Sequence, residues 1–169
     1  RDGVDLVAFG ELAVHTEGRL KSFDSFATEK MDFILGRRGF DEQTPAFTYL
    51  DMMFRPDRYR DTPAIYVKNP QLRSDIVATL SETTVASRPG FTERMAVFEK
   101  RGMAAEQDLR HPAVSALLEE RSRDLIRTAR FVNMIDGALY WKDPNVLVGA
   151  LAVVAPPQGD ESTPWISIA

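Results

Sequence analysis

The chain's densest run of special residue types is His15-Thr16-Glu17-Gly18-Arg19-Leu20-Lys21-Ser22-Phe23-Asp24-Ser25-Phe26-Ala27. Gly18 can take a positive φ angle and so turn the chain. The Ser22 hydroxyl can accept an amide hydrogen from the first turn of a helix, and Asp24 places negative charge at the positive end of that helix. We therefore expect Gly18, Ser22 and Asp24 to be structural residues that join a turn to a helix.

The positions after Ser22 follow helical spacing, with an apolar face that includes one lysine. This face consists of Phe23, Phe26, Ala27, Lys30, Met31 and Ile34. Gly36 is a natural stop for the helix. The segment Val4 to Val14 has no clear helical period, and we expect it to be extended.

Further helix starts are marked by a capping residue followed by proline. They lie at Thr44-Pro45, Asn69-Pro70 and His111-Pro112. We expect the first of these helices to end before a further turn at 56–59, and the second to reach about residue 80. Thr92 is predicted to cap another helix that Gly102 ends.

The segment after His111-Pro112 has the longest regular pattern, with steps of three and four residues that predict one long helix. Its seam consists of Val114, Leu118, Arg121, Leu125, Thr128, Val132, Ile135 and Leu139. Short strands are predicted at Ala64–Val67, Thr83–Ala86 and Val146–Val154. The predicted fold is mainly α, a helical domain of about five helices with a small α+β element.

Length and composition suit one domain over residues 1–169. The chain is 44% hydrophobic and 27% charged, with a formal net charge of -4. A negative charge disfavours a nucleic-acid partner, which needs a basic face. The absence of cysteine excludes disulfides and thiolate chemistry on this chain. The longest apolar run, 146–155, is shorter than the roughly 18 residues of a membrane span. Arg1 at one end and an apolar stretch at the other suggest a fragment of a longer protein.

Two histidines are the candidate metal or haem ligands, and neither has a second ligand at a suitable spacing. We expect His111 to cap its helix. Three interpretations of His15 remain open: a surface imidazole, a hydrogen-bond partner of Asp24, or an axial haem ligand. No metal site is predicted.

Arg19, Lys21 and Asp24 offer two readings. Arg19 can pair with Asp24 and lock the turn onto the helix, because guanidinium and carboxylate groups form bidentate ion pairs. Alternatively, His15, Arg19 and Lys21 form a contact for an acidic group of a ligand or partner. No catalytic residue is predicted; a reaction that uses Asp24 and His15 ranks last among the hypotheses.

The segment 18–27 resembles the G-R-x-K-P-[LF]-D-[ST]-x-A stretch of CcsA/ResB-type cytochrome c biogenesis membrane proteins. Further similar stretches follow in the family's order, with Ser22, Ala13 and Tyr59 in place of two prolines and a tryptophan. They are Leu12 to Glu17, Ile34 to Arg37, Pro45 to Tyr59, Pro63 to Val67, Leu151 to Pro157, and Trp165.

The resemblance implies a membrane-attached domain on the extracytoplasmic (periplasmic) side, within a system that delivers haem to apocytochrome c. The family's tryptophan-rich segment and membrane histidines, which handle haem, have no counterpart here. The expectation is therefore a non-catalytic accessory or scaffold domain that binds no cofactor itself, although haem belongs to the full protein. Expected partners are the remaining membrane segments, apocytochrome c or other maturation components. The alternative is a helical protein-interaction or sensor domain unrelated to haem.

Overall fold

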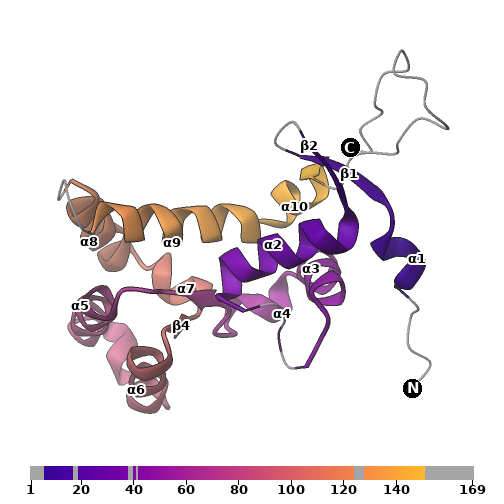
Figure 1. Ribbon diagram of the computed structural model, residues 1–169. Helices are drawn as coiled ribbons and strands as arrows, with labels where there is room; N and C mark the ends of the chain where they lie inside the picture. Colours follow the sequence, from indigo (N-terminus) through magenta and orange to yellow (C-terminus); the bar gives the residue numbers. More distant parts are fainter. Residues whose placement is uncertain (1–5, 17–18, 38–39, 41, 124–127, 151–169) are drawn as a thin grey trace. The chain divides into compact units, whose positions relative to one another are not determined.

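The computed structural model describes residues 6–16, 19–37, 40, 42–123 and 128–150. This part of the chain is mainly helical with two small antiparallel sheets of two strands each, as the sequence predicted (Figure 1). It holds ten α-helices, of which three are single turns of four residues. The chain divides into two compact units: unit 1 is Arg1–Pro56 with Trp141–Ala169, and unit 2 is Asp57–Tyr140.

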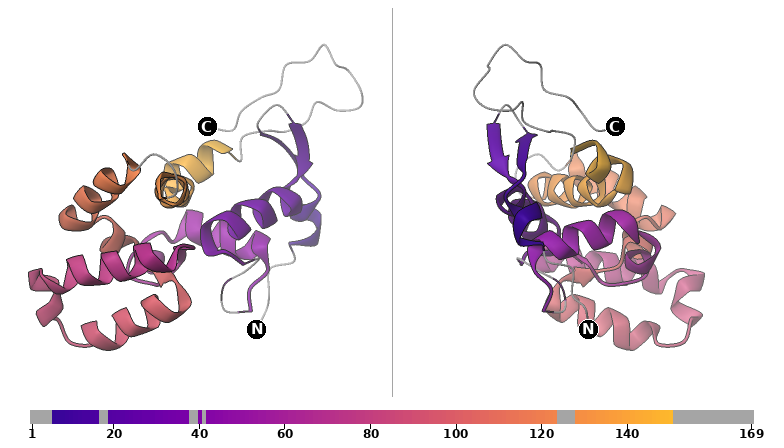
Figure 2. Two further views of the ribbon diagram at one scale, coloured as in Figure 1. Left: turned by 60° about the vertical axis from the view of Figure 1, so that its left-hand side comes forward. Right: turned by 90° about the vertical axis from the view of Figure 1, so that its right-hand side faces the viewer.

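Unit 1 begins with a short helix and a β-hairpin. Its elements are α1 (Val7–Gly10), β1 (Ala13–Thr16), β2 (Arg19–Ser22), α2 (Phe23–Leu35), α3 (Pro45–Phe54) and α10 (Pro144–Ala150). The strands β1 and β2 pair antiparallel, with Ala13 opposite Ser22 and Thr16 opposite Arg19, and lie side by side in Figure 2. Because β2 ends where α2 begins, the hairpin fixes the start of that helix.

The predicted helix caps of unit 1 are present. Ser22 has extended backbone angles, and its hydroxyl accepts a hydrogen bond from the Ser25 amide at 3.3 Å. Gly36 ends α2 in the left-handed conformation, with φ at 65°. Thr44 caps α3 in the same way as Ser22, by accepting from the Phe47 amide at 3.3 Å.

Aromatic side chains form the core of unit 1. Tyr49 of α3 packs edge-on against Phe23 and Phe26 of α2, at ring-centroid distances of 5.6 and 5.3 Å. Phe9 of α1 meets Phe23 edge-on at 4.7 Å. Each fully buried aromatic ring of this size stabilises the fold by about 1.5–3 kcal/mol. The predicted apolar face of α2 is therefore what holds α1 and α3 in place.

Lys30 is the one charged residue on the predicted apolar face of α2, yet it packs with the apolar residues around it. Its side chain is buried, and Nζ lies 3.6 Å from the ring centroid of Trp141 and 5.6 Å from that of Phe26. A cation over an aromatic face is attracted by the ring's quadrupole, and more strongly when water is excluded. Lys30 therefore contributes to the packing of α2 against the second segment of unit 1, which begins at Trp141.

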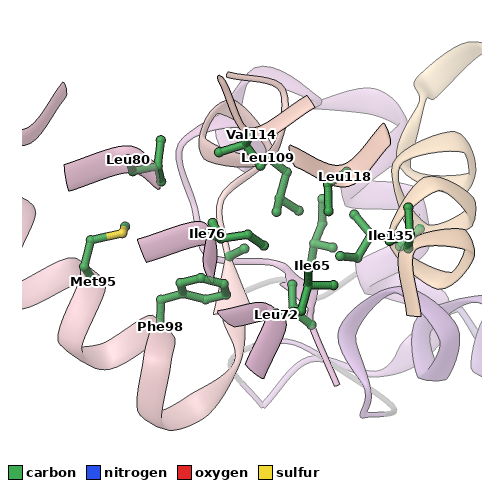
Figure 3. Close-up of a cluster of buried hydrophobic side chains, with 14 of the residues drawn as sticks. Ile65, Leu72, Ile76, Leu80, Met95, Phe98, Leu109, Val114, Leu118 and Ile135 are labelled. Carbon is green, nitrogen blue, oxygen red and sulfur yellow. The ribbon is translucent and has the colours of Figure 1, made fainter. Parts of the chain in front are cut away.

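Unit 2 is a helical unit with one two-stranded sheet. It contains α4 (Asp57–Arg60), β3 (Ile65–Tyr66), α5 (Pro70–Ser81), the 3₁₀ helix η1 (Thr84–Ser87), α6 (Phe91–Arg101), β4 (Met103–Ala104), α7 (Glu106–Leu109), α8 (Pro112–Ser122) and most of α9 (Ala129–Lys142). Ile65 pairs with Ala104, and Tyr66 pairs with Met103. Figure 3 shows the apolar side chains that these helices direct into a shared core, including Ile76, Phe98 and Leu118.

A buried arginine organises one end of this unit. Arg73 Nε donates to the carbonyl of Val67 at 2.6 Å, Nη1 to that of Glu99 at 3.4 Å, and Nη2 to that of Lys68 at 3.3 Å. The guanidinium covers Gly102, where an added Cβ would lie 2.6 Å from Arg73 Cζ. Gly102 ends α6 as predicted, with φ at 78°. This glycine is thus required for both its backbone angle and its lack of a side chain.

Several sequence predictions for unit 2 are confirmed, and three are wrong. The strand near 65, the turn at α4, the helix from Pro70 and the His111 cap are present, with His111 Nδ1 accepting from the Ala113 amide at 3.3 Å. The predicted strand Thr83–Ala86 is instead η1, because the Thr83 hydroxyl accepts from the Val85 amide and tightens the chain. Helix α6 is capped by Gly90 rather than Thr92, which allows Phe91 to be buried in the first turn.

The predicted long helix is two helices, since α8 ends at Ser122 and α9 begins at Ala129. The seam prediction nevertheless holds for Val114, Leu118, Val132 and Ile135, which are all buried in one core. Both helices therefore contribute apolar side chains to the same core. Arg121 instead forms an ion pair with Asp75 of α5 at 3.0 Å.

The two predictions of extended chain in unit 1 are also wrong for the residues described. Within Val4–Val14 the chain forms α1 before it becomes extended in β1. Residues 144–150 form α10, not the start of a strand, because Pro144 suits a first helical turn and Asp143 Oδ1 accepts from the Asn145 amide at 2.8 Å. The remainder of that predicted strand, 151–154, lies outside the described residues.

In the part of the chain that the structure describes, every helix is too short or too polar to cross a lipid bilayer.

Candidate functional site

A cleft of about 690 Å³ lies in unit 1, at the start of α2 and α3. Its described lining consists of Leu6, Val7, Gly10, Glu11, Ser22, Asp24, Gln43, Thr44, Ala46 and Phe47. We call it the α2/α3 cleft. Ligand pockets in proteins have volumes of roughly 300–1,000 Å³, so this cleft is large enough for a ligand or for a segment of a partner.

Three segments that are distant in the sequence form its walls. One wall is α1 with the residues beside it; the other two are the capped ends of α2 and α3. A Cβ at Gly10 would lie 3.5 Å from the Cβ of Asp24, so the end of α1 is in contact with the first turn of α2. The packing of Phe9 on Phe23 holds these two walls together.

The polar groups of the cleft are of two kinds. The hydroxyls of Ser22 and Thr44 already accept hydrogen bonds from their own helices. Glu11 and Asp24 are exposed, and both are carboxylates. Lysine, arginine and histidine are missing from the described lining. The described lining therefore presents negative charge beside an apolar surface.

The apolar part of the lining is accessible to solvent. The side chain of Val7 is 73% exposed, and Leu6 and Phe47 are partly exposed. Leu12, which follows the α1 wall, is also exposed. Exposed apolar residues that line a concave surface are typical of binding sites for ligands or proteins.

The residues predicted to contact a ligand lie on the hairpin strands, and two of them, Arg19 and Lys21, are outside the described lining. His15 pairs with Leu20 across the hairpin, and its side chain is outside the described residues, as is Gly18. Arg19 is exposed. Lys21 forms an ion pair with Glu29 of α2. Among the singled-out residues whose side chains the structure describes, Ser22 and Asp24 line the cleft, and Arg19 and Lys21 do not.

The predicted ion pair between Arg19 and Asp24 is wrong: these two described residues form none. Three positions of extended strand separate Arg19 from Ser22, a distance of about 10 Å at 3.3 Å per residue. The carboxylate that the basic residues surround is that of Glu29. Its pKa is lowered, first by the hydrogen bond from Lys21 and further by the charges of Lys21, Lys30 and Arg19, against an opposing effect of desolvation.

A second cavity, of about 330 Å³, lies in unit 2 between α8 and α9. Asp136 is among the residues that line it, and desolvation raises the pKa of this carboxyl. Apolar side chains such as Leu118 and Val132 make up much of the wall. In the described residues, no three His, Asp or Glu side chains come together as metal ligands.

Sequence reasoning missed most of the α2/α3 cleft. Glu11, Gln43 and Phe47 are ordinary residues in their local sequence, and they meet only because α1 and α3 pack on α2. The sequence signal that pointed to this part of the chain was the pair of helix caps, Ser22 and Thr44.

No protein-family model matches the chain, and no curated protein matches its sequence.

Proposed function

We propose that this chain is a non-catalytic binding module that engages a partner protein through the α2/α3 cleft. The observation that supports the proposal is the cleft itself: an accessible apolar surface bounded by carboxylates and supported by two capped helices. Its walls are held by aromatic packing on the buried ring of Phe23, so the surface is formed before any partner binds. A preformed surface binds without the entropic cost of ordering it.

We further propose that the module works in a cytochrome c maturation assembly, attached to a membrane on its extracytoplasmic side. The support is the similarity of residues 18–27 to the CcsA/ResB-type stretch. In this setting the partners are other segments of the same membrane protein, apocytochrome c or another maturation component. The alternative is the same kind of binding module in an assembly unrelated to haem.

The α2/α3 cleft does not suit haem. Haem carries two propionates, and the described lining supplies carboxylates rather than cations to meet them. We therefore assign haem to the full protein and a polypeptide partner to this cleft. A haem titration of the purified chain should give no Soret shift that depends on Glu11 or Asp24.

Photo-crosslinking in cells tests the proposal directly. Benzoylphenylalanine is placed at position 7 in the cleft or, as a control, at position 97 in unit 2, where the valine is 47% exposed. We expect position 7 to give crosslinks, identified by mass spectrometry, to a protein or segment of the cytochrome c maturation assembly. Crosslinks to other identified proteins would support the alternative setting. Equal or absent crosslinking at the two positions would contradict a binding role for the cleft.

A further inference from the structure

Resting on the proposed binding role, we infer the chemistry of the partner: the α2/α3 cleft receives a basic, amphipathic peptide segment. An apolar side chain of that segment packs against Val7 and Phe47. A neighbouring lysine or arginine lies between the carboxylates of Glu11 and Asp24.

The charge balance favours a cation. Two helix N-termini meet at the cleft, and each carries the equivalent of about half a positive charge. Glu11 and Asp24 contribute two full negative charges at the same place. Among the described lining residues the carboxylates therefore outweigh the helix dipoles, so a lysine or arginine is attracted while an acidic segment is repelled. Ion pairs at such an exposed site steer association more than they add affinity.

The apolar surface favours an extended peptide over a compact cation. Apolar side chains line the cleft on two of its walls, Leu6 and Val7 at α1 and Phe47 at α3. A peptide that crosses the cleft can place apolar side chains on both walls and a basic one between them. A small organic cation could occupy only one of these positions.

Peptide binding with matched variants tests the inference. The probe is the fluorescein-labelled peptide Gly-Leu-Lys-Leu-Lys-Leu-Gly, compared with versions in which Lys is replaced by Glu or Leu by Ser. The full chain is titrated into each by fluorescence anisotropy at low and physiological salt. We expect the first peptide to bind at least tenfold more tightly than either altered peptide, and more weakly as salt rises.

Chain variants then locate the site. The double variant E11Q/D24N should weaken binding about three- to tenfold, the size expected for two exposed ion pairs. D32N is the matched control, because Asp32 is an exposed carboxylate of the same helix outside the described lining. V7S should also weaken binding, whereas V97S should not. Circular dichroism and thermal melts establish that each variant is folded.

Two results would overturn the inference. Preference for the glutamate peptide, or equal affinity of E11Q/D24N, D32N and the parent chain, would show that the carboxylates do not select the partner. If crosslinking at position 7 still finds a partner, the binding role stands and only its chemistry is wrong. If both peptide binding and crosslinking are absent, the proposed function fails as well.

Discussion

The hydroxyl of Tyr49 donates a hydrogen bond to the backbone carbonyl of Leu147 at 2.7 Å, across 98 positions of sequence. Tyr49 is fully buried, and its ring also contacts Phe23 and Phe26. One side chain therefore joins α2, α3 and α10, and so connects the first and last described segments of unit 1.

Tyr49→Phe should lower the free energy of unfolding by about 1–3 kcal/mol. The ring packing is kept, but the buried Leu147 carbonyl loses its donor. Urea unfolding followed by circular dichroism measures the change. An unaltered midpoint would show that water satisfies this carbonyl in the folded state.

The same residue predicts a loss of stability at high pH. Burial raises the pKa of Tyr49 above its usual value near 10. Above pH 10 the unfolded chain releases the phenolic proton that the folded chain retains, so the unfolded state binds fewer protons and stability falls as pH rises. The stability of the parent chain should therefore decline more steeply above pH 10 than that of Tyr49→Phe.

Gly102→Ala should be more destabilising than Gly90→Ala. Both glycines have positive φ, 78° and 75°, so alanine costs about 1–2 kcal/mol of backbone strain at either site. At Gly102 the added methyl also displaces the hydrogen-bonded guanidinium of Arg73, whereas at Gly90 nothing lies within 4 Å. Chemical denaturation of the two variants measures the difference. Equal losses would mean that Arg73 moves aside without cost.

Double-mutant cycles should show coupling between Lys21 and Glu29, and additivity between Arg19 and Asp24. The first two form an ion pair, and the second two do not. Because Glu29 is half exposed, the coupling should be only a few tenths of a kcal/mol, roughly, and should shrink in high salt. Coupling of Arg19 with Asp24 instead would contradict the hairpin register described here.

Asp108 of unit 2 should make the stability of the folded chain fall as pH rises. Most surface acids have the opposite effect. Desolvation raises the pKa of this carboxyl, although Arg94 lies 3.2 Å away and, with Arg88, acts against the shift. Between the usual aspartate pKa near 4 and this higher value, the folded chain binds more protons than the unfolded chain, so stability falls as pH rises.

Comparison with Asp108→Asn isolates that effect. Relative to the variant, the parent chain should gain stability as the pH is lowered from 7 towards 4, measured by thermal melts at each pH. A constant difference between the two would show that the carboxyl has the same pKa in both states.

Local capping chemistry made much of this fold predictable. Ser22, Thr44, Asn69 and His111 each start a helix through a side-chain hydrogen bond within a few residues, and such a signal is complete in the local sequence. Apolar runs were less informative. The residues from Val146 favour a strand by composition, yet they form α10, because a short apolar run fits either a buried strand or a buried helix.

The candidate site was less predictable than the fold. Ser22 and Asp24 were recognised as residues of a helix start, and the structure adds that they line a cleft. Glu11, Gln43 and Phe47 join them only through the packing of α1 and α3 on the aromatic residues of α2. Such long-range contacts have no local sequence pattern.

Unit 1 is discontinuous, since the chain leaves it at Pro56 and returns at Trp141. During synthesis from the N-terminus, the ribosome therefore completes all of unit 2 before α10 exists. Until then Tyr49 lacks its acceptor at Leu147 and Lys30 lacks the ring of Trp141. The cleft and its carboxylates are thus supported by contacts that the chain cannot make before Trp141 and Leu147 have been synthesised, so the cleft gains its full support only after unit 2 is complete.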